Sequence, residues 1–514
     1  MVEISSEYAV QMRGINKSFG TVNVLKNMEL DVKKGSIHAI LGENGAGKST
    51  LMNILYGLYH ADSGEIYING EQKYIKNAAA AINMGIGMVH QHFMLIDKFT
   101  VMQNIVLGKE ATGRFGILKT RKSRKKIKEL IEKYNLDVNL DAKVRDISVG
   151  MQQKVEILKA LYRGAQLLIL DEPTAVLTPM EVDELINIMD SLVKDGKAII
   201  IITHKLKEIK KSADECTVIR KGKFIDRVKV SDETTRSLAQ KMVGREVRLT
   251  VEKSPPKIGE KIFEIDDIHV RCSRGIETVK GLSLSVRRGE IVGLAGIEGN
   301  GQKELIEALI SVRNVESGTI KLDGVEIQNT SPANVLKHGV SVIHADRHKY
   351  GIILDFTVAE NAILERYRYK PYSERGMLND KTRDKFTEKL IEEYDIRPKN
   401  CENLLIRSLS GGNQQKLVIG REISNEPNLL IAVQPTRGLD VGAIEYVHKT
   451  LIDLRNRNKA ILLISLELDE IMDLSDTVAV MYDGAVNGVF KREDVDENII
   501  GLLMAGGQEN EKCC

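Results

Sequence analysis

Short apolar runs alternate with amphipathic stretches along most of this chain. SIHAILG (36–42), AIIII (198–202) and AILLIS (460–465) each have the length and composition of a buried strand. KSTLMNILYGL (48–58) and the region 116–160 instead have a helical pattern. Because buried strands and helical segments take turns, the pattern predicts βαβ units around largely parallel sheets, which is an α/β fold. No apolar run approaches the ~18–20 residues that a membrane-spanning helix needs.

The chain carries this pattern twice. Lys48 in KKGSIHAILGENGAGKSTL (33–51) aligns with Gln302 in RRGEIVGLAGIEGNGQKEL (287–305), an offset of 302 − 48 = 254 residues. LLILDEPTAVLT (167–178) likewise recurs as LLIAVQPTRGLD (429–440). A period this long indicates two whole domains rather than a solenoid of short repeats. We expect the first domain at 1–243 and the second at 262–508, joined by a Pro-containing, charged linker at 244–261.

Composition narrows the possible function classes. The 514 residues carry a formal net charge of +2, which gives no case for general attraction to nucleic acid or lipid. The start, MVEISSEYAV, contains two glutamates and lacks the apolar core of a secretory signal. The five cysteines show no metal-binding spacing and fit a reducing compartment. We therefore expect a cytoplasmic protein.

The segment GENGAGKS (42–49) matches the phosphate-binding pattern G-x-x-x-x-G-K-[ST] between a predicted strand and a predicted helix. Its glycines let backbone N–H groups close on phosphate oxygens, and the start of the helix favours the anion. Lys48 would reach the β- and γ-phosphates of a nucleotide, and the Ser49 hydroxyl would bind Mg²⁺. The residues of this loop expected to bind ATP are Gly42, Asn44, Gly45, Gly47, Lys48, Ser49 and Thr50.

Polar side chains after other predicted strands would complete the chemistry. Asp171 and Glu172 end an apolar run, and strand ends in an α/β sheet face the ligand crevice. Asp171 suits Mg²⁺, mostly through water, and Glu172 suits polarising the attacking water. Gln91 could touch both metal and water, and His204 could contact the γ-phosphate. The alternative for either acid alone is a structural ion pair, and Gln91 and His204 could likewise be structural.

These motifs, in this order, resemble those of the ATP-binding cassette (ABC) ATPases over nearly the whole chain. The most specific is LSGGNQQK (409–416), which resembles the signature sequence of that family. The resemblance implies two P-loop NTPase domains, each with a mixed or parallel β core and a helical subdomain, packed head to tail. ATP would lie between the P-loop of one copy and the signature of the other. The resemblance makes Phe19 the adenine-stacking residue, Gln91 the Q-loop residue and His204 the switch histidine, and from the signature it adds Ser410, Gly411, Gly412 and Gln414.

The second copy lacks the reactive side chains of the first. The substituted positions of this degenerate site are Gln302 for Lys48, Lys303 for Ser49, Val433 for Asp171, Gln434 for Glu172 and Leu466 for His204. For the signature, the second copy is intact and the first is altered. The first copy has Val149 where the second has a glycine that lets the backbone approach phosphate. Head-to-tail pairing would then join all the intact motifs in one composite site and the altered ones in the other. We therefore expect one hydrolytic site per chain.

The resemblance leaves more than one kind of protein open. An importer ATPase would dock on separate integral-membrane permease chains at the cytoplasmic face of the membrane, and a solute-binding lipoprotein would serve it indirectly. A soluble translation or repair factor and a nucleotide-sensing scaffold are the alternatives. The short linker, the altered second site and the lack of zinc-binding cysteines favour the importer. LSGGNQQK and ENGAGKST are similar to ribose/galactose-type sugar importers, and GMVHQHFMLIDKFTVMQNIVLG (87–108) is closer to the nucleoside-uptake branch.

Overall fold

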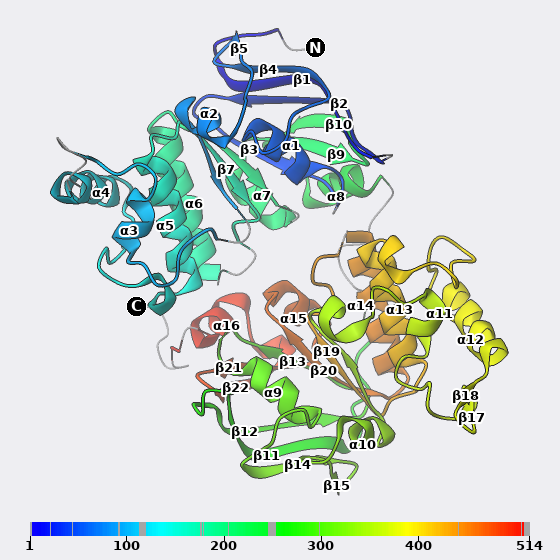
Figure 1. Cartoon of the computed structure of the whole chain (residues 1–514). Helices are drawn as coiled ribbons and strands as arrows, with labels where there is room; N and C mark the ends of the chain where they lie inside the picture. Colours follow the sequence, from blue (N-terminus) through cyan, green and yellow to red (C-terminus); the bar gives the residue numbers. More distant parts are fainter. Residues whose placement is uncertain are drawn as a thin grey trace. The chain divides into compact units, whose positions relative to one another are not determined.

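A computed structural model describes residues 3–20, 22–43, 45–90, 93–112, 120–174, 177, 179–203, 205–244, 253–297, 299–439, 441–504 and 506–507. The chain packs into two compact units, Met1–Val247 and Arg248–Cys514. Each unit contains a four-stranded antiparallel sheet, a six-stranded and mostly parallel sheet, and a group of helices beside them (Figure 1). No helix among the described residues is both long and apolar enough to cross a membrane.

The first unit is built on two sheets with the orders β2–β1–β4–β5 and β10–β9–β3–β8–β7–β6. Its strands are β1 (Tyr8–Phe19), β2 (Val22–Lys33), β3 (Ile37–Leu41), β4 (Ser63–Ile68), β5 (Glu71–Gln72), β6 (Ile86–Val89), β7 (Leu167–Asp171), β8 (Ala198–Ile202), β9 (Glu215–Arg220) and β10 (Lys223–Lys229). Its helices are α1 (Lys48–Leu55), α2 (Ala78–Asn83), α3 (Val101–Val106), α4 (Thr120–Tyr134), α5 (Val149–Tyr162), α6 (Pro179–Lys194), α7 (Leu206–Ser212) and α8 (Thr235–Val243).

The second unit repeats this topology, with sheet orders β12–β11–β14–β15 and β16–β19–β20–β13–β21–β22 and an added β17–β18 hairpin. Its strands are β11 (Lys261–Arg271), β12 (Glu277–Arg287), β13 (Ile291–Ala295), β14 (Ser317–Leu322), β15 (Val325–Glu326), β16 (Val340–Ile343), β17 (Ser373–Glu374), β18 (Met377–Leu378), β19 (Leu429–Val433), β20 (Ala460–Ser465), β21 (Thr477–Tyr482) and β22 (Ala485–Lys491). Its helices are α9 (Gln302–Leu309), α10 (Pro332–Lys337), α11 (Val358–Ala362), α12 (Asp380–Glu393), α13 (Gly411–Ile423), α14 (Val441–Asn456), α15 (Leu468–Leu474) and α16 (Glu497–Met504).

The predicted α/β fold with two tandem copies is confirmed. The apolar runs at 198–202 and 460–465 form β8 and β20, which are buried along their whole length in the six-stranded sheets. β8 is apolar at every position and β20 at every position except the buried Ser465, because a central parallel strand is covered on both faces. The largely helical region predicted at 116–160 is more interrupted. Residues 135–148 between α4 and α5 contain only a single 3₁₀ turn, Val144–Asp146.

The segment around the predicted linker is partly attached to the second unit. α8 ends at Val243, and the next strand, β11, begins at Lys261. Lys253 donates a hydrogen bond to the carbonyl of Ser475 at 2.6 Å, and Arg455 donates one to the carbonyl of Ser254 at 2.6 Å. These bonds tie residues 253 and 254 to the second unit.

His38 is a buried titratable group near the start of β3. Its Nε2 lies 2.8 Å from the Thr217 hydroxyl of β9. Burial lowers the pKa of His38 to about 4, and the charges of Arg227 and Lys33 act in the same direction against Glu215 and Asp31. The corresponding pair in the second unit is apolar, Val292 and Ala479.

We expect the first unit to lose stability in acid because of His38. In the unfolded chain this histidine has its ordinary pKa near 6.5, so the unfolded state binds the proton first as pH falls. The contribution is complete above about pH 6.5 and declines towards pH 4, by about 3 kcal/mol in total. Hydrogen exchange of β3 amides, corrected for intrinsic exchange, should show this loss. The His38→Val/Thr217→Ala variant should lack it, and an equal pH dependence in both proteins would contradict the assignment.

Candidate functional site

The predicted phosphate-binding loop runs from the end of β3 to the start of α1. Gly47 precedes α1 with a left-handed φ of 101°, and a Cβ there would lie 2.6 Å from Leu25 Cδ2. Gly45 also has a positive φ, 78°, but a Cβ on it would meet nothing within 4 Å. Gly47 is therefore required by both its backbone conformation and the packing around it, whereas Gly45 leaves open space at the loop.

Lys48 is the first residue of α1, and its side chain folds back over the loop. Its Nζ donates hydrogen bonds to the carbonyl oxygens of Gly42, at 2.6 Å, and Glu43, at 3.0 Å. Only 6% of Lys48 is exposed. Burial lowers the pKa of the ammonium group, and the nearby carboxylates of Glu172, Asp171 and Glu43 oppose that shift. The amine is thus held at the loop by neutral carbonyl groups, close to both strand-end acids.

Ser49 and Asp171 come together although they are far apart in the sequence. The Ser49 hydroxyl donates a hydrogen bond to the Asp171 carboxylate at the end of β7. Burial, and then the charge of Glu172, raise the pKa of Asp171 to about 6, while Lys48 and Ser49 act against that rise. A hydroxyl and a carboxylate held side by side are oxygen ligands of the kind that Mg²⁺ prefers.

The backbone at Glu172 has the same shape as the backbone at Gln434 in the second unit. Both residues have a left-handed φ, 46° for Glu172 and 43° for Gln434. The Glu172 N–H donates to Ile202 at 2.8 Å, and the Gln434 N–H donates to Ile464 at 2.7 Å. The second unit has therefore lost the carboxylate but kept the local structure that presented it.

A further pair of contacts supports both of these strand ends. The Thr174 hydroxyl donates to Glu208 at 2.6 Å, and the Thr436 hydroxyl donates to Glu470 at 2.8 Å. In each unit the contact ties the segment after the strand-end position to the helix that follows the next strand. These hydrogen bonds give Glu208 and Glu470 a structural role.

Gln302 takes the place of Lys48 at the second loop. It is also the first residue of its helix, α9, and is 8% exposed, and Gly301 before it has a left-handed φ of 92°. The Gln302 Nε2 lies 2.7 Å from the position of a Cβ on Gly296, the counterpart of Gly42. The second loop therefore has the same shape with a neutral amide in it. Lys303, in the place of Ser49, is exposed.

Two other substituted positions of the second unit are apolar. Val433 is 4% exposed and belongs to the hydrophobic core that also contains Ile464. Leu466 is half-buried directly after β20. Neither side chain can ligate a metal or transfer a proton.

Three predicted site residues, Asn44, Gln91 and His204, lie outside the described residues. Phe19 ends β1 and is 43% exposed, with its ring 5.2 Å from Tyr59 in an edge-on contact. An aromatic ring left this exposed is available to stack on a ligand. Thr50 is half-buried in the first turn of α1.

The second signature forms the start of α13. The Ser410 hydroxyl caps this helix by accepting a bond from the Asn413 N–H at 3.4 Å, and Gly411 and Gly412 are its first two residues. Gln414 is 5% exposed, and its Nε2 donates to the carbonyls of Ile406 and Leu409 at 3.2 and 3.1 Å. Gln414 therefore stabilises the turn that leads into the signature helix.

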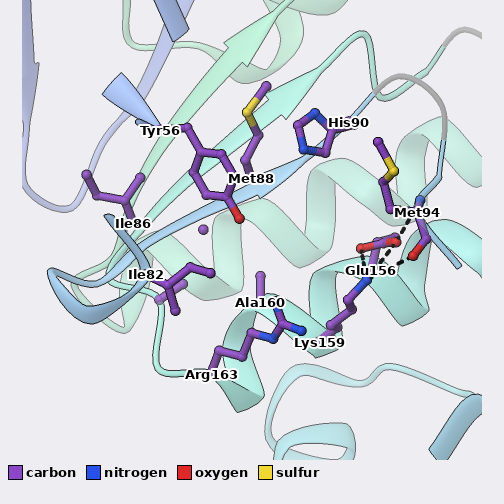
Figure 2. A pocket seen from close by; sticks show the side chains of 12 residues that line it. Tyr56, Ile82, Ile86, Met88, His90, Met94, Glu156, Lys159, Ala160 and Arg163 are labelled. Carbon is purple, nitrogen blue, oxygen red and sulfur yellow. Dashed lines mark hydrogen bonds and ion pairs between the residues drawn. The ribbon is translucent and has the colours of Figure 1, made fainter. Parts of the chain in front are cut away.

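A cavity of about 260 Å³ lies beside the segment that leads to Gln91. Figure 2 shows Tyr56, Met88 and His90 on one side of it, and Lys159 and Ala160 of α5 with Arg163 directly after that helix on the other. Its remaining lining residues are Ile82, Ile86, Gly87, Met94, Glu156 and Ala165. Lys159 donates to the carbonyl of Met94 at 3.2 Å and to Glu156 at 3.2 Å. The cavity is therefore an apolar recess with a charged edge.

The corresponding region of the second unit carries a buried ion pair. Arg421 aligns with Lys159 and is 2% exposed, and Glu422 aligns with Ala160 and is fully buried. Arg421 donates to Glu422 at 2.8 Å and to the carbonyl of Gly351 at 2.9 Å. Sequence reasoning did not single out these residues, because their burial and the contact with Gly351 depend on segments that are distant along the chain.

The class of ABC-type ATPases is defined by a phosphate-binding loop and a signature helix, which both units contain, together with the strand-end acids of the first unit. The family description "ABC transporter" matches residues 25–175 and 279–437, and the chain belongs to that family. It is 52% identical to the nucleoside import ATP-binding protein NupA of Lactococcus lactis subsp. cremoris, over 99% of this chain and 100% of that protein. It is 53% identical to the guanosine import ATP-binding protein NupO of Bacillus subtilis, over 98% of this chain and 99% of that protein.

A solved structure also matches most of the chain. The archaeal ribosome recycling factor aABCE1, in complex with the ribosomal stalk protein aP1, superposes with a TM-score of 0.59 and 18% identity. The match covers 92% of this chain and 89% of that chain. At this identity the likeness concerns the fold alone.

Proposed function

We propose that this protein is the ATP-hydrolysing subunit of an importer for nucleosides. The observation that carries the proposal is its identity of 52% and 53%, end to end, with two proteins named for nucleoside and guanosine import. It would bind at the cytoplasmic face of the membrane to separate permease chains, which receive solute from an extracytoplasmic lipoprotein. A ribose/galactose-type sugar importer is the alternative, and a soluble translation or repair ATPase has less support.

The catalytic roles follow from the chemistry of the first unit. Lys48 would bind the β- and γ-phosphates of ATP, and Glu172 would polarise the attacking water, assisted by Gln91 and His204. Ser49, Asp171 and Gln91 would hold Mg²⁺. The hydrogen-bonded Ser49–Asp171 pair supports this assignment. When bound, the metal would neutralise charge on the β- and γ-phosphates.

The second unit would complete this site rather than form a site of equal activity. Ser410, Gly411 and Gly412, with Gln414 behind them, would face the ATP held by the first unit in a head-to-tail arrangement. Gln302, Val433, Gln434 and Leu466 supply no cation, metal ligand or base for a second reaction. We also propose that the first nucleotide-binding domain spans residues 1–243 and the second spans residues 262–508.

The cavity lined by His90 would offer a docking place for a permease helix. It combines apolar walls, including Ile86 and Met88, with Lys159 and Arg163 at its edge. Together with FTVMQNI (99–105), this surface would transmit closure around ATP to the permease. The Arg421–Glu422 pair makes the corresponding region of the second unit chemically different.

Uptake by cells lacking this protein tests the transported solute. We expect deletion to reduce uptake of labelled guanosine at least about tenfold, because transport depends on the hydrolysis step. Wild-type protein should restore uptake, and the Glu172→Gln variant should not. Loss of labelled ribose uptake with unchanged guanosine uptake would instead support the sugar importer. Co-purification with ribosomes rather than permeases would contradict both.

A further inference from the structure

Arg347 lies against the second signature, in the segment that follows β16. It begins a π-helical turn, Arg347–Gly351, three residues after His344. Its Nη2 lies 2.7 Å from the position that a Cβ would take on Gly411, the first residue of α13. Its Nε and Nη1 each lie 3.4 Å from neutral oxygens, those of Gln414 and of the Arg437 carbonyl. A glycine is thus needed at 411 for the guanidinium to reach this position.

The charge of Arg347 is not balanced by a bonded carboxylate. The side chain is half-buried, and burial lowers the pKa of its guanidinium. The nearby Asp346 opposes that shift, but its Oδ1 accepts the backbone N–H groups of His348 and Lys349. In the described parts of the chain, no carboxylate forms an ion pair with Arg347. A partly desolvated cation with only neutral partners is suited to an anionic ligand.

The first signature has the opposite charge beside it. Phe93, three residues after His90, stands where the second unit has Arg347, and Val149 stands where it has Gly411. A Cβ on Gly150, the counterpart of Gly412, would clash with the carboxylate of Glu181. The counterpart of Glu181 in the second unit is Ala443, at an offset of 443 − 181 = 262 residues. The start of α5 therefore faces a carboxylate, and the start of α13 faces a guanidinium.

We propose that Arg347 recognises the γ-phosphate of ATP at the second signature and makes this signature selective for ATP over ADP. The start of α13 presents Ser410, which is exposed, and the helix dipole favours an anion there. Arg347 adds a full positive charge at the same end. The first signature has the Glu181 carboxylate at the corresponding end of its helix instead of a guanidinium. This inference rests on the proposed pairing of the second signature with ATP held by the first unit.

The test measures ATP and ADP affinities of the full chain with Glu172→Gln as the background, so that ATP persists. Adding Arg347→Ala should weaken ATP binding about tenfold, the usual effect of losing one charge-assisted hydrogen bond. ADP affinity should change less than about twofold in this comparison, because ADP has no γ-phosphate. Arg347→Lys should recover most of the ATP affinity, since it keeps the charge.

Two further variants separate recognition from a structural role. Gly411→Ala should displace the guanidinium and weaken ATP binding as Arg347→Ala does, and the double variant should be no worse than either single one. Arg368→Ala removes an exposed arginine far along the sequence from the signature and should leave both affinities unchanged. Unchanged ATP affinity in Arg347→Ala, or an equal loss for ATP and ADP, would overturn the proposal. Rapid hydrolysis by Glu172→Gln itself would instead refute the proposed catalytic site.

Discussion

Replacing Glu172 by glutamine should reduce steady-state ATP hydrolysis by the full chain by about 10²- to 10⁴-fold, the usual contribution of a general base. The change removes the carboxylate that would polarise water and keeps the side-chain volume. The protein itself shows that the fold accepts the change. Gln434 occupies the matching position with a φ of 43°, against 46° at Glu172, and the same backbone hydrogen bond. Steady-state and single-turnover hydrolysis of ATP by the purified chain measure the effect.

The reverse change at the second unit is the matched control. Gln434→Glu alone should leave the rate of hydrolysis unchanged, because Gln302 and Val433 still provide neither a cation nor a metal ligand. The combination Gln302→Lys/Val433→Asp/Gln434→Glu should also fail to create a second full site unless Val149→Gly is added. Substantial residual turnover in Glu172→Gln would show that a second site hydrolyses ATP, and the one-site assignment would then be wrong.

Replacing Lys48 by glutamine should weaken ATP binding and lower kcat/KM by about 10²-fold or more, as expected for the loss of a buried charge that contacts phosphate. The P-loop should keep its shape. Gln302 already fits the equivalent position, 8% exposed against 6% for Lys48, and its Nε2 lies close to Gly296, the counterpart of Gly42. Equilibrium binding of a fluorescent ATP analogue and the steady-state rate would be measured on the same preparation.

Gln302→Ala serves as the control for Lys48→Gln. It shortens the side chain at the corresponding place of the second loop without changing its charge, so the rate of hydrolysis should stay within about twofold of wild type. A loss of kcat/KM in Gln302→Ala as large as in Lys48→Gln would mean that both loops bind the nucleotide that reacts. Circular dichroism of each variant would verify that the fold is retained.

The local motifs were predictable because each encodes its own backbone geometry. The glycines at 45 and 47 allow positive φ, and the apolar run before Asp171 forms a buried strand whose end presents that acid. The internal repeat was equally plain, because the substitutions at 302, 433 and 434 fall inside otherwise matching segments. Local pattern predicted a mostly helical region at 116–160, which α4 and α5 confirm, but it did not locate the break at residues 135–148. Apolar residues there pack in the core without helical hydrogen bonding.

The sequence by itself determined that this protein has two ABC cassettes, that the first carries the reactive side chains, and that the second keeps a glycine-rich signature. The tertiary structure alone decided which distant side chains meet. β8 lies between β3 and β7 in the sheet, and the folded chain brings Ser49 into hydrogen-bond contact with Asp171. Folding likewise places Arg347 beside Gly411 and Glu181 beside Gly150. Such contacts depend on strand order and packing, whereas a motif records only neighbours along the chain.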